Sequence, residues 1–245
     1  MHALRCTFDH NNARLHGGGI FGSEDTTLFV NQSQFYANQA QRHGGGILSL
    51  GVARVTRSHF ASNRAQSGGA IAGWTGARQI SVIGSSFVGN VADGAGAGIS
   101  IGAKGSRGAL PTLTVLHSKF IANEAKVGSG GAINIQRTDF HIAKSHFTNN
   151  TSPGNGGGAI SCAFVMTRAP EIIPFPSEIV ECEVRNNRAA TGGGLRAYEC
   201  NYTVRSSIMH GNHATGAGGA LTIDANAMVI VKDGTTITGN TCVHA

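Results

Sequence analysis

Apolar residues recur along this chain at a fixed distance from asparagine. In nine places an aromatic or other apolar residue is followed three positions later by Asn. Six pairs begin with phenylalanine: Phe8/Asn11, Phe35/Asn38, Phe60/Asn63, Phe87/Asn90, Phe120/Asn123 and Phe147/Asn150. Three pairs begin with another apolar residue: Val184/Asn187, Met209/Asn212 and Ile237/Asn240. Self-similarity at a period of about 20 to 50 residues is typical of repeat architectures.

A glycine cluster alternates with these pairs. Eight to ten residues after each Asn except the last, a Gly-rich run closes on an aliphatic residue: Ile20, Ile47, Ile71, Ile99, Ile133, Ile160, Leu195 or Leu221. Upstream of many Phe-type residues, apolar side chains lie five and seven positions earlier, and a small residue lies two positions earlier. The small residues are Cys6, Ser33, Ser58, Ser85, Ser118, Ser145, Cys182, Ser207 and Thr235. Spacings of two place side chains on one strand face, and the change of spacing between them indicates a bend.

Each repeat therefore predicts three short strands separated by bends, which is one coil of a β-helix. We expect an all-β fold: a right-handed, single-stranded parallel β-helix (a solenoid) of about nine coils, with three short strands per coil. At about 4.8 Å per coil, the rod would be on the order of 40 Å long. Residues 1–245 would form a single β-helix domain, and we expect it to be a fragment of a longer chain because both ends stop within a coil. Open coil ends also predict end-to-end self-association.

The Phe and Asn positions are expected to be structural. Stacked coils would place the rings in one internal column, where each ring buries about 150 to 250 Å². The Asn residues would form a second column at a bend, because Asn tolerates the left-handed backbone region and its amide can bond the Asn above and below. The expected ladder comprises Phe35, Asn38, Phe60, Asn63, Phe87, Asn90, Phe120, Asn123, Phe147 and Asn150.

The composition agrees with a repeat architecture and argues against several classes of partner and cofactor. The chain has 36 Gly, and only 13% of its residues are charged. The net charge of +6 comes from scattered Lys and Arg, so we expect a solvated basic surface and no nucleic-acid partner. No apolar run approaches the roughly 20 residues of a membrane-spanning helix, so membrane attachment is expected only through parts absent from this chain. The five Cys show no metal-binding spacing, and we expect no cofactor.

The alternation of the two motifs resembles the FxxN and GGA(I/L/V) repeat of the chlamydial polymorphic outer membrane proteins. The resemblance runs from Phe8 to Asn240, and several clusters read Gly-Gly-Ala-Ile, as at residues 68–71 and 157–160. It implies a pectin-lyase-like β-helix that serves as an autotransporter passenger and adhesin. The implied location is the cell surface, the outer membrane or the extracellular space. The chain departs from the family design because it contains neither a signal peptide nor a carboxyl-terminal barrel segment.

Two repeats are longer than the others and predict insertions. The interval from Phe87 to Phe120 is 33 residues and that from Phe147 to Val184 is 37, against 25 to 28 elsewhere. The excess falls at 102–111 and at 163–177. The candidate binding residues in these loops are Lys104 and Arg107 in the first and Phe164, Met166, Ile172 and Phe175 in the second. The second loop either packs on the flank of the helix or offers a contact surface to a partner.

Histidine and the acidic residues supply two weaker candidate sites. His16 and His43 precede Gly clusters in successive repeats, so stacking would bring them close enough to share a metal, but Ser67 occupies the next position. Glu181 and Glu183 would share one strand face, with Arg185 at the next position on it. This is the best catalytic cluster available for a polysaccharide lyase or glycoside hydrolase, which needs clustered carboxylates or a Ca²⁺ site with a base.

The favoured function is a non-catalytic, surface-displayed or secreted module that binds a cell-surface protein or glycan of a host or neighbouring cell. Two alternatives remain: a β-helical polysaccharide-acting enzyme and a purely structural spacer. Asn31, Asn149, Asn150 and Asn201 head N-x-(S/T) sequons, which would carry glycans only in a secreted eukaryotic protein.

Overall fold

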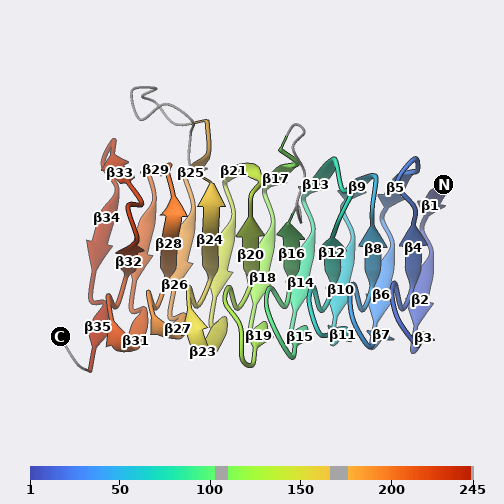
Figure 1. Cartoon of the computed structure of the whole chain (residues 1–245), viewed down its shortest axis with the longest axis horizontal. Helices are drawn as coiled ribbons and strands as arrows, with labels where there is room; N and C mark the ends of the chain where they lie inside the picture. The colour runs from blue at the N-terminus through green and yellow to red at the C-terminus, as the bar shows by residue number, and fades with distance from the viewer. Residues whose placement is uncertain (103–109, 166–175, 244–245) are drawn as a thin grey trace.

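The computed structural model describes residues 1–102, 110–165 and 176–243, with the backbone alone at Val165. Within these ranges the chain forms 35 strands and no helix. The strands form four parallel sheets that run along a rod, with the two termini at opposite ends (Figure 1). Every named strand pairs with the equivalent strand of an adjacent coil, as expected for a β-solenoid.

Three of the sheets contain nine strands each. The first sheet comprises β1 (His2–Leu4), β5 (Thr27–Asn31), β9 (Val52–Thr56), β13 (Gln79–Ile83), β17 (Thr112–Leu116), β21 (Asp139–Ala143), β25 (Glu178–Val180), β29 (Tyr202–Arg205) and β33 (Val229–Lys232). The second sheet comprises β2 (Thr7–Asp9), β6 (Gln34–Tyr36), β10 (His59–Ala61), β14 (Ser86–Val88), β18 (Lys119–Ile121), β22 (His146–Thr148), β26 (Glu183–Arg185), β30 (Ile208–His210) and β34 (Thr236–Thr238). The third sheet comprises β3 (Asn12–Ala13), β7 (Gln39–Ala40), β11 (Arg64–Ala65), β15 (Val91–Ala92), β19 (Glu124–Ala125), β23 (Thr151–Gly156), β27 (Arg188–Thr191), β31 (His213–Ala217) and β35 (Thr241–Cys242).

The fourth sheet has eight strands and lies toward the viewer in Figure 1. It comprises β4 (Ile20–Gly22), β8 (Ile47–Ser49), β12 (Ile71–Gly73), β16 (Ile99–Gly102), β20 (Ile133–Gln136), β24 (Ile160–Val165), β28 (Leu195–Cys200) and β32 (Leu221–Asp224). The described chain therefore makes eight complete coils of four strands and three strands of a ninth.

The predicted parallel β-helix is confirmed, but the prediction of three strands per coil is wrong. The unexpected strand is the one in the third sheet, directly after each Asn of the repeat. In the first five coils this strand is only two residues long. Two residues are too few to show an alternation of apolar and polar positions, so the hydrophobic pattern could not reveal it.

The phenylalanine column forms the centre of the interior. Consecutive rings from Phe8 to Phe147 lie 4.5 to 4.9 Å apart between centroids, with interplanar angles of 3 to 10°. Phe35, Phe60, Phe87, Phe120 and Phe147 are fully buried. Val184 and Met209 continue the column in the later coils, where their register partners are Phe147 and Ile237. The expected Phe ladder is confirmed.

The asparagine column forms a continuous hydrogen-bonded ladder. In each coil the Asn Nδ2 donates to Oδ1 of the Asn in the next coil at 2.8 to 3.0 Å, and the backbone N–H donates to the same oxygen. From the second coil onward, Nδ2 also donates to the backbone carbonyl of the Phe-type residue one coil earlier. Buried polar groups are stable only when bonded in this way.

The backbone at this bend differs from the expectation in one respect. The left-handed residue is not the Asn but the residue before it, as at Ala37, Ser62 and Ala122, with φ between 48 and 56°. The Asn itself is therefore selected for its buried amide, which no other side chain of its size supplies with both a donor and an acceptor. Its tolerance of a left-handed backbone plays no part.

The small residues before the Phe positions form a third column. The backbone N–H of Ser33, for example, donates to Oγ of Ser58 at 3.1 Å, and Ser58 repeats this contact with Ser85. Cys182 takes a place in this column, and burial raises the pKa of its thiol to about 12. Because the thiolate is the reactive form, this shift makes Cys182 a structural residue of the column and a poor nucleophile.

The two long intervals fall between equivalent strands of the coil. One interval joins the end of β16 at Gly102 to β17, and the other joins the end of β24 at Val165 to β25. Each therefore connects the fourth sheet to the first. Lys104, Arg107, Met166, Ile172 and Phe175 lie outside the described residues. Phe164 lies within them.

In the described part of the chain, no helix is long and apolar enough to span a bilayer.

Candidate ligand-binding site

The outer face of the fourth sheet carries an unusual set of side chains between its fifth and eighth strands. Strand alternation places Ile133 and Ile135 in the core, so Asn134 between them points outward. Parallel register then aligns two outward columns along the rod. One contains Asn134, Ser161, Arg196 and Thr222, and the other contains Gln136, Ala163, Tyr198 and Asp224.

Arg196 is the centre of this cluster. Its Nε donates to Oδ2 of Asp224 at 3.0 Å, and its Nη1 donates to Oδ1 of Asn155 at 2.5 Å. The guanidinium carbon also lies 5.5 Å from the centre of the Tyr198 ring, within the range of a cation–π contact. These contacts hold the guanidinium in one position, and only 18% of the side chain is exposed.

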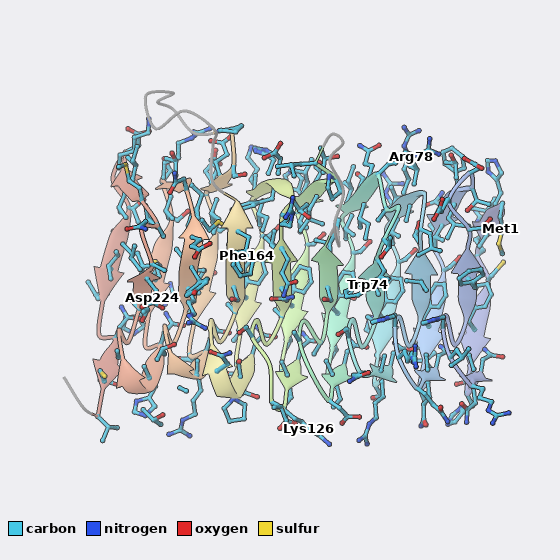
Figure 2. All side chains as sticks on the ribbon, viewed as in Figure 1. Met1, Trp74, Arg78, Lys126, Phe164 and Asp224 are labelled. Carbon is cyan, nitrogen blue, oxygen red and sulfur yellow. A yellow bond between two sulfur atoms is a disulfide. The ribbon has the colours of Figure 1, made fainter. Side chains whose placement is uncertain are left out.

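Two aromatic rings flank the arginine. Phe164 meets Tyr198 edge to face, with 5.5 Å between centroids and an interplanar angle of 80°. Phe164 is 48% exposed, so about half of its surface remains open to solvent although it contacts Tyr198. In Figure 2, Phe164 and Asp224 both lie over the face of the fourth sheet.

These residues surround a cavity of about 250 Å³. Its lining residues are Ser129, Asn134, Gln136, Asn155, Ser161, Ala163, Phe164, Arg196 and Tyr198. Asn134 and Ser161 form a floor and are almost inaccessible, at 4% and 3% exposure. The lining combines amides, hydroxyl groups, one cation and two rings, which is the mixture expected of a site that orients a polar ligand.

The backbone beneath the cavity is reinforced. β24 and β28 each contain six residues, more than any other described strand of the fourth sheet. A disulfide joins Cys162 in β24 to Cys200 at the end of β28, with 5.9 Å between their Cα atoms. Both cysteines are buried. The two strands that present the aromatic rings are therefore covalently tied across adjacent coils.

Phe164 adopts a left-handed backbone conformation with φ of 60°. Arg137, Glu199 and Ala225 hold the equivalent position in other coils, directly after the residues of the Ala163 column, and all three have φ between 47 and 51°. The conformation thus belongs to a regular bend at the end of the fourth sheet, and the bend directs Phe164 beside Tyr198.

The acidic cluster considered from the sequence lies elsewhere. Glu183 and Arg185 are both on β26, where Val184 between them is buried, and they form an ion pair. Glu181 lies in the bend before β26, with φ of 49°, so the prediction that it shares a strand face with Glu183 is wrong. A left-handed residue at this bend was not evident from spacing alone.

Each carboxylate of that cluster has a cationic or imidazole partner in a neighbouring coil. His146 Nδ1 lies 2.8 Å from Glu183, and Lys144 lies 3.7 Å from Glu181. Glu178 contacts Arg205 and His141, each at 3.0 Å. The arrangement ties coils together through surface contacts, of which the ion pairs to Lys144 and Arg205 are worth about 0 to 1 kcal/mol each.

His16 and His43 do meet, as stacking predicted. Their rings are parallel, with 5.2 Å between centroids and 4° between planes, and Trp74 stacks on the other side of His43 at 4.5 Å. Burial lowers the pKa of His43 to about 4, with further effects from His16 and Arg42. Zinc ligands converge on the metal at about 2.0 to 2.1 Å, whereas parallel rings direct their nitrogens side by side. The geometry favours an uncharged aromatic stack.

No cluster of three or more His, Cys, Asp or Glu side chains suited to a metal occurs among the described residues.

Sequence reasoning singled out Phe164 but not its partners. Asn155, Arg196, Tyr198 and Asp224 come from three different coils and share no motif. The signal that could have found Arg196 is the alternation after each glycine cluster, which identifies the outward residue of every strand in the fourth sheet. Reading those positions along the rod gives Ser100, Asn134, Ser161 and Arg196 as neighbours.

Comparison with known proteins supports the repeat. The sequence profile of the Chlamydia polymorphic membrane protein (Chlamydia_PMP) repeat matches residues 144–163. This segment contains β22, β23 and the start of β24, and so includes one FxxN pair and one glycine cluster. No curated protein and no solved structure matches the chain. The resemblance noted from the two motifs is thereby confirmed.

Proposed function

We propose that the chain is a non-catalytic, surface-associated binding module of the adhesin type, displayed as an autotransporter-like passenger. Its contact with the partner is made through the outer face of the fourth sheet. The observation that carries the proposal is the cavity bounded by Phe164, Arg196 and Tyr198 on that face. A rigid scaffold that presents one irregular face is a common arrangement for recognition.

Two features support display outside the cytoplasm. The polymorphic membrane protein repeat is one. The other is the Cys162–Cys200 disulfide, since structural disulfides form and persist mainly in oxidising compartments.

The distribution of carboxylates favours binding over catalysis. Glycoside hydrolysis typically needs two carboxyl groups about 5 to 10 Å apart that flank the bond to be cleaved. The described residues that line the cavity include no Asp or Glu, and the nearby Asp224 is held by Arg196. The denser glutamate cluster at β25 and β26 is ion-paired.

The test is binding of the labelled chain to a panel of eukaryotic and bacterial cells, measured by flow cytometry. We expect saturable binding that unlabelled chain displaces, and loss of that binding in the double variant Phe164→Ala/Tyr198→Ala. The control is Phe21→Ala/Tyr36→Ala, since Phe21 is 53% exposed on the same sheet in the first coil and Tyr36 lies on the second sheet.

Other results would assign the chain differently. No saturable binding to any cell type would favour a structural spacer. Release of reducing or unsaturated ends from polysaccharides by the wild type would favour the enzyme.

A further inference from the structure

We infer that the cavity on the fourth sheet binds a short, neutral oligosaccharide aligned with the rod. This inference rests on the proposed function and names the ligand class. It is carried by the donor and acceptor set of the cavity, its charge balance, its aromatic wall and the direction of its columns.

The polar lining matches a polyhydroxylated ligand. Sugar hydroxyl groups donate and accept at the same time, so they pair best with side chains that offer both functions. Asn134, Gln136 and Asn155 carry amides, each with two donors and one acceptor oxygen, and Ser161 carries a hydroxyl. Gln136 and Asn155 are exposed at the rim, while Asn134 and Ser161 lie at the floor. A pyranose ring entering the cavity would meet such groups from two sides.

The charge balance favours a neutral ligand. Arg196 is the one cation among the described lining residues, and its Nε is bonded to Asp224 at 3.0 Å. The Arg196 side chain is 18% exposed and that of Asp224 is 37% exposed, so solvent reaches the pair mainly from the Asp224 side. Asp224 offsets the charge of the guanidinium, so the described lining offers no net positive charge to a sulfate or carboxylate on the ligand. A hydroxyl group can add to the pair without breaking it.

The aromatic wall supplies an apolar surface for a sugar ring. The C–H groups on one side of a pyranose carry slight positive charge, and the face of an aromatic ring is negative. Phe164 is fixed by its edge contact with Tyr198 and leaves about half of its surface open, at 48% exposure. The disulfide between Cys162 and Cys200 fixes the strands that carry these rings. Pre-organisation of this kind lowers the entropic cost of binding.

The columns set the direction of the ligand. Gln136, Ala163, Tyr198 and Asp224 are register partners in four successive coils. Three steps of about 4.8 Å give a line of about 14 Å parallel to the axis. Because the Ala163 side chain is small, it leaves space in the column between the Gln136 amide and the Tyr198 ring. A chain of a few sugars fits this line better than a single ring does.

The experiment measures binding of the purified chain to an immobilised panel of neutral oligosaccharides, sulfated or uronic acid oligosaccharides, and peptides. The test variants are Phe164→Ala and Asn155→Ala, because both side chains are exposed and we expect their loss to leave the fold intact. The matched controls are Phe21→Ala and Asn12→Ala, which remove an exposed Phe and an exposed Asn far from the cavity. Far-UV circular dichroism and urea unfolding establish that all four variants fold.

We expect saturable binding of one or more neutral oligosaccharides, weakened at least about tenfold by either test variant and unchanged in either control. Affinity should be constant between about 50 and 500 mM NaCl, since an uncharged ligand is not subject to screening. Exclusive binding of acidic oligosaccharides with affinity that falls in salt, exclusive binding of peptides, or equal effects of test and control variants would overturn the inference.

Periodate oxidation separates this inference from the proposed function. It cleaves the vicinal diols of cell-surface sugars and leaves most peptide groups intact. If the chain binds no neutral saccharide and its binding to cells persists after oxidation, the adhesin function is supported and the oligosaccharide ligand is refuted. Saccharide binding without binding to any cell would support the oligosaccharide as the ligand of the cavity and refute the adhesin function.

Discussion

At the residue scale, the molecule is held together by identical side chains placed directly above one another. The Asn ladder is the clearest case, because each buried amide accepts from one neighbouring coil and donates to the other. Removing one Asn leaves polar groups on two coils without partners. The energetic cost of an unsatisfied buried group is about 1 to 3 kcal/mol.

We therefore expect Asn123→Ala to lower the free energy of unfolding by about 3 kcal/mol. The variant removes the acceptor for both the backbone N–H and Nδ2 of Asn90, and the donor to the Phe87 carbonyl. Urea unfolding followed by circular dichroism measures the change. Asn12→Ala, at an exposed position beside the ladder, is the control and should change stability by less than about 0.5 kcal/mol. Equal effects of the two variants would show that the ladder is not a source of stability.

The histidine stack gives a pH-dependent prediction. Burial, the charge of His16 and that of Arg42 lower the pKa of His43 to about 4, whereas an unfolded His titrates near about 6.5. Between these values the unfolded chain binds more protons than the folded one, so stability falls as the solution is acidified from about pH 6.5 to 4.

His43→Phe keeps a ring between His16 and Trp74 but cannot take up a proton. Stability of this variant should fall less steeply over that pH range than stability of the wild type. His16 and His59 retain pKa values lowered in the same direction, so part of the slope will remain. Parallel curves of urea midpoint against pH for the two proteins would contradict the lowered pKa.

At the scale of the strand, sequence pattern predicted the elements that are long enough to alternate. The first, second and fourth sheets follow from the apolar positions before the Phe, at the Phe and after the glycine cluster. The two-residue strands of the third sheet carry no such alternation and were missed. The register of the coils was predictable because all nine copies place the Asn three positions after the Phe-type residue.

The disulfide and most of the candidate site were not predictable for related reasons. Counting in twos from buried Leu195 places Cys200 on the outer face, but the left-handed residue Glu199 reverses the side and returns Cys200 to the core. The site residues Asn155, Arg196 and Asp224 are brought together only by coil stacking. A site whose residues come from different coils leaves no motif within a single repeat.

The Cys162–Cys200 bond should stabilise the coils that carry the cavity. Its loop spans 38 residues, for which the loss of chain entropy in the unfolded state corresponds to about 4 kcal/mol. We expect the double variant Cys162→Ala/Cys200→Ala to unfold at lower urea concentration and to become insensitive to reductant. Wild type and Cys182→Ala should both lose stability when reduced, since the Cys182 thiol takes no part. A linked peptide containing Cys162 and Cys200 in a non-reduced digest verifies the bond.

At the scale of the whole molecule, the rod is tightly packed along most of its length and open at its last coils. Ile223, Val231 and Ile237 are between 41 and 48% exposed, although equivalent side chains in earlier coils are buried. Exposed strand edges and apolar ends favour stacking on another coil.

A preparation of residues 1–245 alone should therefore associate end to end as its concentration rises. Sedimentation velocity would show an increase in mean mass with concentration, and Ile237→Lys at the exposed end should shift the equilibrium toward monomer. The control is Ile121→Lys, an exposed isoleucine on the flank of the same sheet. A monomer at every concentration would refute the association.

The central claim is that the fourth sheet carries the binding face of this rod. Hydroxyl-radical footprinting of the chain bound to its target cells tests the claim most directly, because it locates the contact on the unmodified sequence. We expect protection of Phe164 and Tyr198, with Tyr36 on the second sheet labelled equally in the free and bound chain. Protection of Tyr36 with full labelling of Phe164 and Tyr198 would contradict it.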